Sequence, residues 1–126
     1  MMAKSVITNI ARQKMAKARY DGTPIEKVKY IALGDGGVNE AGEVIYPLPE
    51  NVKLKNELIR KEYNSCTKIS ETSYEYIIEL GPMELAGKFI SEAALIDEAE
   101  DVIAFSNFLA KGKDETEVIF SIRDNY

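Results

Sequence analysis

The sequence predicts an α+β fold, in which an N-terminal amphipathic helix packs on a mostly antiparallel β-sheet or sandwich. Near the N-terminus, apolar residues recur with the period of a helix, and the later segments alternate between apolar and polar residues as strands do. One helix followed by a run of strands is typical of an α+β domain. The length of 126 residues fits one domain, so we expect a single unit over residues 1–126.

The predicted helix begins near Thr8 or Asn9 and runs to about Tyr20. Both side chains at its start can accept a hydrogen bond from a free backbone N–H. An apolar stripe at helical spacing consists of Ile7, Ala11, Met15 and Ala18. The opposite face is basic and carries Arg12, Lys14, Lys17 and Arg19. The segment 21–24 ends the helix, because its glycine suits a left-handed cap and its proline cannot continue the helix.

Six strands are expected after the helix. The first runs from Ile25 to Leu33 and ends at the turn Gly34-Asp35-Gly36-Gly37, where glycine permits a sharp change of direction. The second, Leu58–Cys66, alternates poorly and suits an edge of the sheet. The other four are Ser73–Leu80, Phe89–Ile96, Val102–Phe108 and Glu117–Ile122, with an acidic hairpin loop at 97–101.

The segment between the first two strands, residues 38–56, has a weak pattern and is predicted to be an extended loop. Pro47 and Pro49 argue against a regular element there. A loop of that length in a small domain is usually functional. We expect it to be mobile until a partner orders it.

The composition excludes several kinds of chemistry. The chain has no histidine, which excludes a Ser-His-Asp triad, a Cys-His pair and a histidine metal site. Its one cysteine, Cys66, excludes an internal disulfide and fits a reducing compartment. No apolar run reaches the roughly 20 residues of a membrane helix. The net charge of −5 argues against general nucleic-acid binding.

No motif predicts a catalytic, cofactor or metal residue. The turn 34–37 lacks the Lys-Ser/Thr of a phosphate-binding loop and the spacing of a dinucleotide motif. The acidic stretches 35–40 and 97–101 lack the glycine that a calcium loop requires at its sixth position.

Charge is distributed unevenly along the chain. Residues 1–29 are mostly basic, whereas residues 88–110 are mostly acidic. The two regions either pair within the fold or between neighbouring subunits, or they form solvated surfaces. The basic helix face and the proline loop are the candidate docking sites for a partner protein. The candidate residues are Arg12, Lys14, Lys17, Tyr46, Pro47 and Pro49.

Several short motifs occur in an informative order. Ile31–Gly37 combines a strand with the glycine turn, and Leu54-Lys55-Asn56-Glu57 follows the proline loop. Ile90–Asp97 and Val102–Asn107 then flank the acidic turn. In this order they resemble the N-terminal domain of phage tail-collar and tail-fibre proteins, from contractile-tailed phages or phage-tail-like bacteriocins. The resemblance covers nearly the whole chain.

The resemblance implies a non-enzymatic structural component that anchors or adapts a tail fibre at the baseplate or collar. The implied partners are baseplate or collar proteins and the tail-fibre protein, without cofactor, nucleic acid or membrane. The implied location is a virion or phage-tail-like particle, assembled in the bacterial host cytoplasm. Because the sequence stops at Tyr126, just after the closing strand, we expect the attachment module rather than receptor binding. A monomer or weak oligomer is expected in solution, and a defined oligomer in the particle.

Two alternatives stay open at this point. A small tail-associated glycosidase would need a carboxylate pair across a cleft, for instance Glu75 and Glu92. A nucleic-acid binder would use the basic helix, in particular Lys14 and Lys17.

Overall fold

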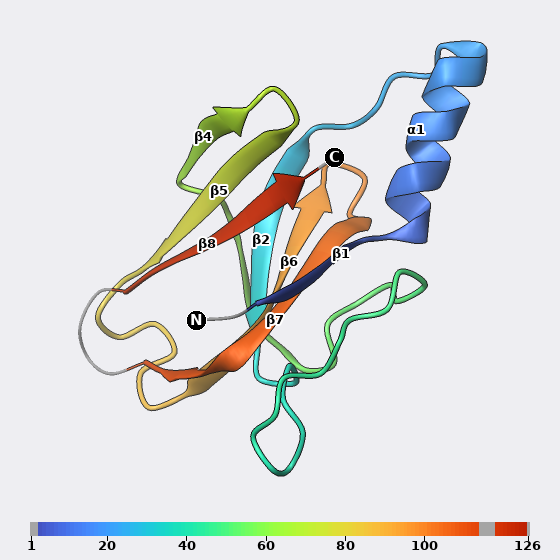
Figure 1. Cartoon of the computed structure of the whole chain (residues 1–126). Helices are drawn as coiled ribbons and strands as arrows, with labels where there is room; N and C mark the ends of the chain where they lie inside the picture. The colour runs from blue at the N-terminus through green and yellow to red at the C-terminus, as the bar shows by residue number, and fades with distance from the viewer. Residues whose placement is uncertain (1–2, 114–117, 126) are drawn as a thin grey trace.

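The computed structural model describes residues 3–113 and the backbone of residues 118–125. This part of the chain forms one helix and eight strands, which Figure 1 shows in order from blue to red. In chain order, they are β1 (Lys4–Ile7), α1 (Asn9–Asp21), β2 (Val28–Gly34), β3 (Glu57–Glu62), β4 (Ser65–Ser70), β5 (Ser73–Leu80), β6 (Phe89–Asp97), β7 (Val102–Gly112) and β8 (Val118–Asn125).

The strands form two antiparallel sheets. The larger has five strands in the order β1-β7-β6-β2-β3, and the smaller has three in the order β4-β5-β8. Every strand pair in both sheets is antiparallel. The mostly antiparallel architecture that the sequence predicts is therefore confirmed.

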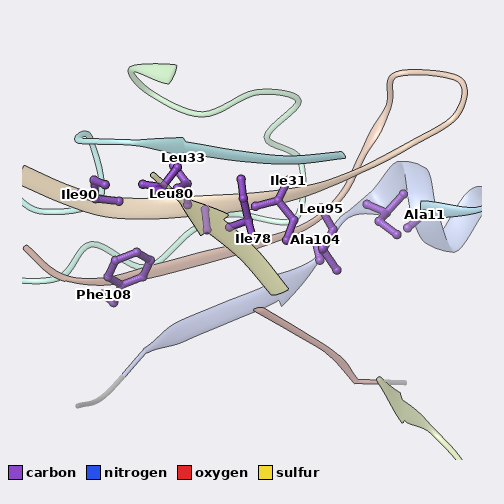
Figure 2. Packing of buried hydrophobic residues seen from close by; sticks show 11 residues of the cluster. Ala11, Ile31, Leu33, Ile78, Leu80, Ile90, Leu95, Ala104 and Phe108 are labelled. Atoms are coloured by element: carbon purple, nitrogen blue, oxygen red, sulfur yellow. The ribbon is translucent and has the colours of Figure 1, made fainter. Parts of the chain in front are cut away.

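The smaller sheet packs on one face of the larger sheet and closes the main core. Ile78 and Leu80 of β5 lie among buried residues of the large sheet, including Leu33, Leu95 and Phe108 (Figure 2). The alternation of β5 explains this contact, because residues two apart on a strand share a face. The molecule is thus a two-layer sandwich at its centre.

The opposite face of the large sheet has a second, smaller core. Ala32, Ala94, Ile96 and Phe105 project to this side and pack with Leu54, which belongs to the loop between β2 and β3. Strands β6 and β7 are consequently buried on both faces over most of their length. This explains why their sequences are almost continuously apolar or small.

The helix contacts the body chiefly through its first turn. Thr8 caps it by accepting the Ala11 backbone N–H, and Gly22 ends it with a φ of 76°. Among the helix residues only Ala11 is buried, and the C-terminal end of α1 stands away from the sheets (Figure 1). Packing of the predicted apolar stripe is therefore limited to the start of the helix.

The expected strand Leu58–Cys66 is wrong as a single element. The chain instead leaves the large sheet at the end of β3 and enters the small sheet with β4. Asn64 makes the crossing, since its backbone N–H donates to Ile77 and its side chain accepts the Glu79 N–H. The segment that the sequence predicts as one strand thus contributes one strand to each sheet.

Other boundaries also differ from expectation. Strand β1 was not expected, because the sequence pattern places Ile7 in the apolar stripe of the helix. This strand pairs with Ala104–Asn107 of β7. Strand β2 begins at Val28 rather than Ile25. The last strand spans Val118–Asn125, and the expected start at residue 117 lies outside the described residues. No helix among the described residues has the length and apolar character needed to cross a membrane.

Candidate docking surface

A buried carboxylate organises the glycine turn at the end of β2. Glu92 of β6 is only 2% exposed. Its Oε2 accepts the backbone N–H of Gly36 at 2.8 Å and of Asn56 at 2.9 Å, and its Oε1 accepts that of Lys55 at 3.0 Å. We call this arrangement the Glu92 clamp. The segment 34–37 is therefore a turn rather than a phosphate-binding loop. The Gly36 N–H, which a bound phosphate would need as a donor, already donates to Glu92.

The clamp explains why glycine occurs in this turn. A Cβ added at Gly34 would lie 2.3 Å from the Asn56 carbonyl oxygen, and one at Gly37 would lie 2.0 Å from the Ser91 carbonyl oxygen. At Gly37 the backbone is held this close to Ser91 by a hydrogen bond, which the Gly37 N–H donates to Ser91 Oγ at 2.9 Å. Close backbone approach, rather than ligand binding, accounts for these glycines.

The loop 38–56 leaves and returns at the clamp and lies against the large sheet. The Ile45 N–H donates to the Gly37 carbonyl at 2.9 Å, and the Asn107 side-chain amide donates to the Ile45 carbonyl at 2.9 Å. The Asn9 N–H donates to the Pro49 carbonyl at 2.7 Å. The loop has no helix or strand beyond an isolated bridge between residues 38 and 44, as expected, but it is anchored at several points.

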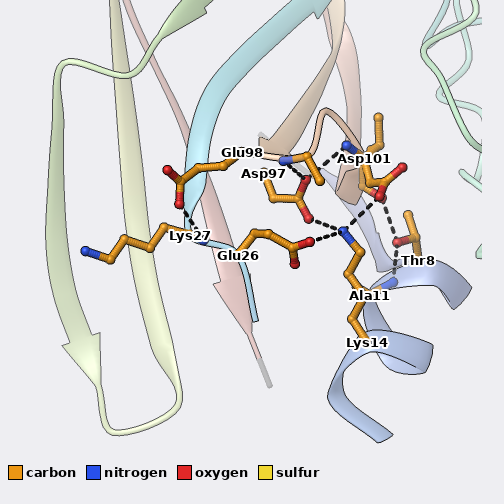
Figure 3. A network of polar contacts seen from close by, with 10 residues as sticks. Thr8, Ala11, Lys14, Glu26, Lys27, Asp97, Glu98 and Asp101 are labelled. Carbon is orange, nitrogen blue, oxygen red and sulfur yellow. Dashed lines mark hydrogen bonds and ion pairs between the residues drawn. The ribbon is translucent and has the colours of Figure 1, made fainter. Parts of the chain in front are cut away.

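A second cluster of charges holds the helix to the acidic hairpin turn (Figure 3). The Lys14 Nζ lies 2.6 Å from Asp97 Oδ2, 2.8 Å from Asp101 Oδ2 and 3.4 Å from Glu26 Oε1. Asp97 is 1% exposed, and its Oδ1 also accepts the N–H of Ala99 and Asp101. These four side chains, Lys14, Glu26, Asp97 and Asp101, form the Lys14 cluster.

The Lys14 cluster changes the acidity of its central ammonium. Partial burial lowers the pKa of Lys14, but hydrogen bonds to Asp101 and Asp97, together with their charges, outweigh this effect and raise the pKa above its usual value. The ammonium therefore stays charged at any physiological pH. Pairing of the basic N-terminal region with the acidic hairpin within the fold is thus observed.

A cleft of about 350 Å³ lies next to this cluster, between the helix and the small sheet. Met15 lines its helix side, and Ile25 lines it from the segment that leads into β2. Its aromatic lining consists of Tyr63, Tyr74 and Tyr76. The rings of Tyr63 and Tyr76 meet edge to face with centroids 5.2 Å apart. We call it the tyrosine cleft.

Comparison with known proteins identifies the family. The family model described as phage tail-collar fibre protein, N-terminal, matches residues 2–119. The chain belongs to this family. Neither the curated proteins nor the solved structures gave a match. The resemblance expected from the sequence is confirmed, and family membership makes the protein a structural component of a phage tail, associated with the virion.

The sequence motifs on which the resemblance rests coincide with the two buried carboxylate sites. Glu92 lies within the Ile90–Asp97 motif, and the clamp joins it to the glycine turn and to Asn56. Asp97 ends the same motif and anchors the hairpin turn. The order of these motifs in the sequence therefore has a structural basis, since each contributes to an internal network.

The predicted docking residues of this tail-collar fibre domain differ in how far they are exposed at the surface. Arg12 and Lys17 are exposed on the helix, and Tyr46 is exposed on the loop with the Lys4 ammonium 4.7 Å from its ring centroid. Pro49 is half-buried, and its carbonyl joins the loop to the start of the helix. The two remaining candidates point inward: Pro47 is buried, and Lys14 is held by three carboxylates.

Sequence reasoning missed the tyrosine cleft. Of the two tyrosines that β5 contributes to it, Tyr76 is half-buried and Tyr74 is 41% exposed. Two tyrosines two residues apart on one strand share a face, and this spacing was the available signal. The helix that forms the other wall could not be placed from the sequence.

The described geometry does not favour the glycosidase alternative. Both carboxylate oxygens of Glu92 are bonded to backbone N–H groups, whereas a catalytic acid must reach a substrate in a cleft. Within residues 3–113 and 118–125, no group of three or more potential ligands is arranged to hold a metal ion.

Proposed function

We propose that this protein anchors or adapts a tail fibre to the baseplate or collar of a phage tail or phage-tail-like particle, without enzymatic activity. The observation that carries the proposal is the match of residues 2–119 to the N-terminal domain of tail-collar fibre proteins. The partners are baseplate or collar proteins on one side and the tail-fibre protein on the other. Assembly takes place in the bacterial host cytoplasm.

The proposed docking surface combines the helix and the loop. It consists of Arg12 and Lys17 of α1 with Tyr46, Leu48 and Pro49 of the loop, and we call it the loop–helix surface. The backbone hydrogen bond between Asn9 and Pro49 makes these two elements neighbours. An exposed tyrosine and leucine beside basic groups suit a protein partner, because aromatic residues and arginine are enriched at interfaces.

The rest of the molecule supports a role as a rigid module. The clamp and the Lys14 cluster fix the loop and the helix relative to the sheets, so a partner would meet a largely preformed surface. Stable docking should bury at least about 1,000 Å² in total. We also propose a monomer or weak oligomer in dilute solution and a defined oligomer within the particle.

Binding between purified proteins tests the proposal. The protein is immobilised and presented separately with the baseplate, collar and fibre proteins encoded in its own genome. We expect binding to at least one of them, weakened at least about tenfold by Arg12→Glu with Lys17→Glu, and similarly by Tyr46→Ala. Lys88→Glu, an exposed charge change near the start of β6, is the matched control and should have no effect.

Two results would contradict the proposal. One is the absence of binding to every one of these proteins when the wild-type chain is folded. The other is turnover of purified peptidoglycan that is lost on Glu75→Gln, which would establish an enzyme.

A further inference from the structure

The tyrosine cleft is an apolar recess that the chain leaves open. Its volume falls in the range of ligand and side-chain pockets, about 300–1,000 Å³. Ile25 and Tyr74 both line the cleft and are both substantially exposed, although Ile25 is apolar and Tyr74 carries a large aromatic ring. A side chain inserted against them would remove apolar surface from water.

The Lys14 cluster gives one edge of the cleft an excess of negative charge. Three carboxylates of this cluster surround a single ammonium. Lys14, Glu26 and Asp97 line the cleft directly, and so does the cation Lys27, which leaves an excess of one negative charge. A suitable occupant therefore combines a large, flat apolar group with adjacent positive charge.

The chain itself presents such a group at the tip of its helix. Tyr20 is 91% exposed, more than any other large hydrophobic residue among those described. Lys17 and Arg19 precede it on the last turn of α1 and are also exposed. Because this end of the helix stands away from the sheets, it can reach a second molecule (Figure 1).

Tyr46 is the other exposed tyrosine beside a cation, and it is less suitable. The Lys4 ammonium already lies over its ring, and its loop is bonded to the large sheet. Tyr46 is also less exposed, at 66%. Insertion of Tyr46 into a recess would require these contacts to be broken, whereas insertion of Tyr20 requires no such loss.

We propose that Tyr20 of one copy inserts into the tyrosine cleft of a second copy, with Lys17 and Arg19 facing the acidic residues at its edge. The contact is head-to-tail, since the helix tip and the cleft are different surfaces of the same chain, and repetition of it builds a ring or an open row of subunits. One tyrosine contributes about 150–250 Å² of buried surface, well below a stable interface, so the contact forms at high local concentration.

A disulfide cross-link between two distinguishable chains tests this contact. The first chain carries Asp21→Cys with Cys66→Ser, which places a thiol beside an intact Tyr20. The second is the wild-type chain with a different tag, whose only cysteine, Cys66, is exposed and lines the cleft. The two chains are mixed at about 100 μM each and oxidised mildly, and the mixed dimer is quantified on non-reducing gels.

The matched controls keep the new thiol and change one tyrosine. Adding Tyr20→Ser to the first chain should reduce the mixed dimer at least about fivefold, whereas adding Tyr46→Ser should leave it unchanged. Salt at about 0.5 M should also reduce the yield, because it screens the charge attraction. Circular dichroism confirms that each variant is folded.

Equal yields with and without Tyr20→Ser would overturn the proposal. So would a yield that depends on Tyr46 instead, because the loop would then be the occupant. Sedimentation of the wild-type chain at rising concentration gives a second readout. It should show self-association that Tyr20→Ser abolishes, and an unchanged profile for that variant would equally overturn the proposal.

Discussion

Two buried acids on one strand each fix a turn. Glu92 lies toward the start of β6 and Asp97 ends it, and both accept hydrogen bonds from backbone N–H groups of neighbouring loops. The N–H donors replace the water that a buried carboxylate loses, which offsets the cost of burying it. The two acids therefore hold the loops in place.

Replacing Glu92 should destabilise the protein strongly. Glu92→Ala leaves three backbone N–H groups without their acceptor, and we expect the free energy of unfolding to fall by about 3 kcal/mol. Glu92→Gln should cost less, about 1–2 kcal/mol, because one oxygen remains while an NH₂ group faces an N–H donor. Urea denaturation measures both, with the exposed Glu40→Gln as control. A Gln variant as stable as the wild type would show that the carboxylate charge has no part in the clamp.

Replacing Lys14 should loosen the helix. Lys14→Met keeps most of the side-chain packing but leaves Asp97 buried without its counter-ion, and we expect a loss of about 2 kcal/mol. The pKa of Lys14 is raised in the folded state, so its stabilisation is complete below the unfolded pKa of about 10.4 and is lost as pH rises further. The difference between variant and wild type should thus be constant from about pH 6 to 9 and shrink above about pH 10.

Denaturation at several pH values checks this dependence. Lys17→Met, which removes an exposed charge from the same helix, is the control and should leave stability nearly unchanged. A difference that grows above pH 10 would contradict the assigned sign.

Among the elements, the loop 38–56 behaves as part of the fold. Its Leu54 enters the second core, and backbone and side-chain hydrogen bonds join it to the sheet and to the start of the helix. Hydrophobic anchoring of a long loop requires only a few apolar residues at the right points, which periodicity cannot reveal. The expectation of a mobile loop rested on that missing periodicity.

Hydrogen exchange separates an anchored loop from a mobile one. The Ile45 amide donates to the Gly37 carbonyl and should exchange at least about tenfold more slowly than the Glu40 amide at the exposed end. Asn107→Ala, which removes the bond to the Ile45 carbonyl, should speed exchange at Ile45. Equally fast exchange at Ile45 and Glu40 in the isolated protein would mean that the loop becomes ordered only on a partner.

At the scale of the whole molecule, stability is concentrated in β6 and β7. These strands pair with each other and are covered by the small sheet on one face and by the loop on the other. In contrast, all six residues of β4 are exposed, and this strand pairs only with β5. Edge strands with little burial open at lower cost than central ones.

Native-state hydrogen exchange followed by NMR should reproduce this gradient. We expect the slowest amides around Leu95 and Ala104, with protection close to the global free energy of unfolding, and much faster exchange through Ser65–Ser70. Equal protection of β4 and β6 would show instead that both sheets open as one cooperative unit.

The sequence was sufficient to predict a mostly antiparallel β structure with one helix, because several elements were locally complete. The helix had its cap at Thr8 and its glycine stop at Gly22, and the hairpin between β6 and β7 had long apolar strands around an acidic turn. The failures were at the edges of the sheets. The four residues of β1 are too few to show a period, and only tertiary pairing divides 57–70 into two strands.

The site was less predictable than the fold. Exposed helix charges and Tyr46 followed from the sequence, because a polar helix face and a loop are normally solvated. The inward orientation of Lys14 and Pro47 did not, since it depends on where the acidic turn and the large sheet lie in space. The tyrosine cleft likewise exists only through the meeting of the helix with the small sheet.

The Glu92 clamp has a consequence for how the loop can vary. It draws the two ends of the loop together, with Gly36 on one side and Asn56 on the other bonded to the same oxygen atom. A Cβ added at Gly42, at the far tip, would meet no atom within 4 Å, so we expect residues inserted there to find open space and to leave this neck unchanged. Doubling the length of a flexible loop costs only about 0.6 kcal/mol. The tip is thus a place where peptides can be grafted, or where natural insertions can accumulate, while the sheet beneath keeps its register.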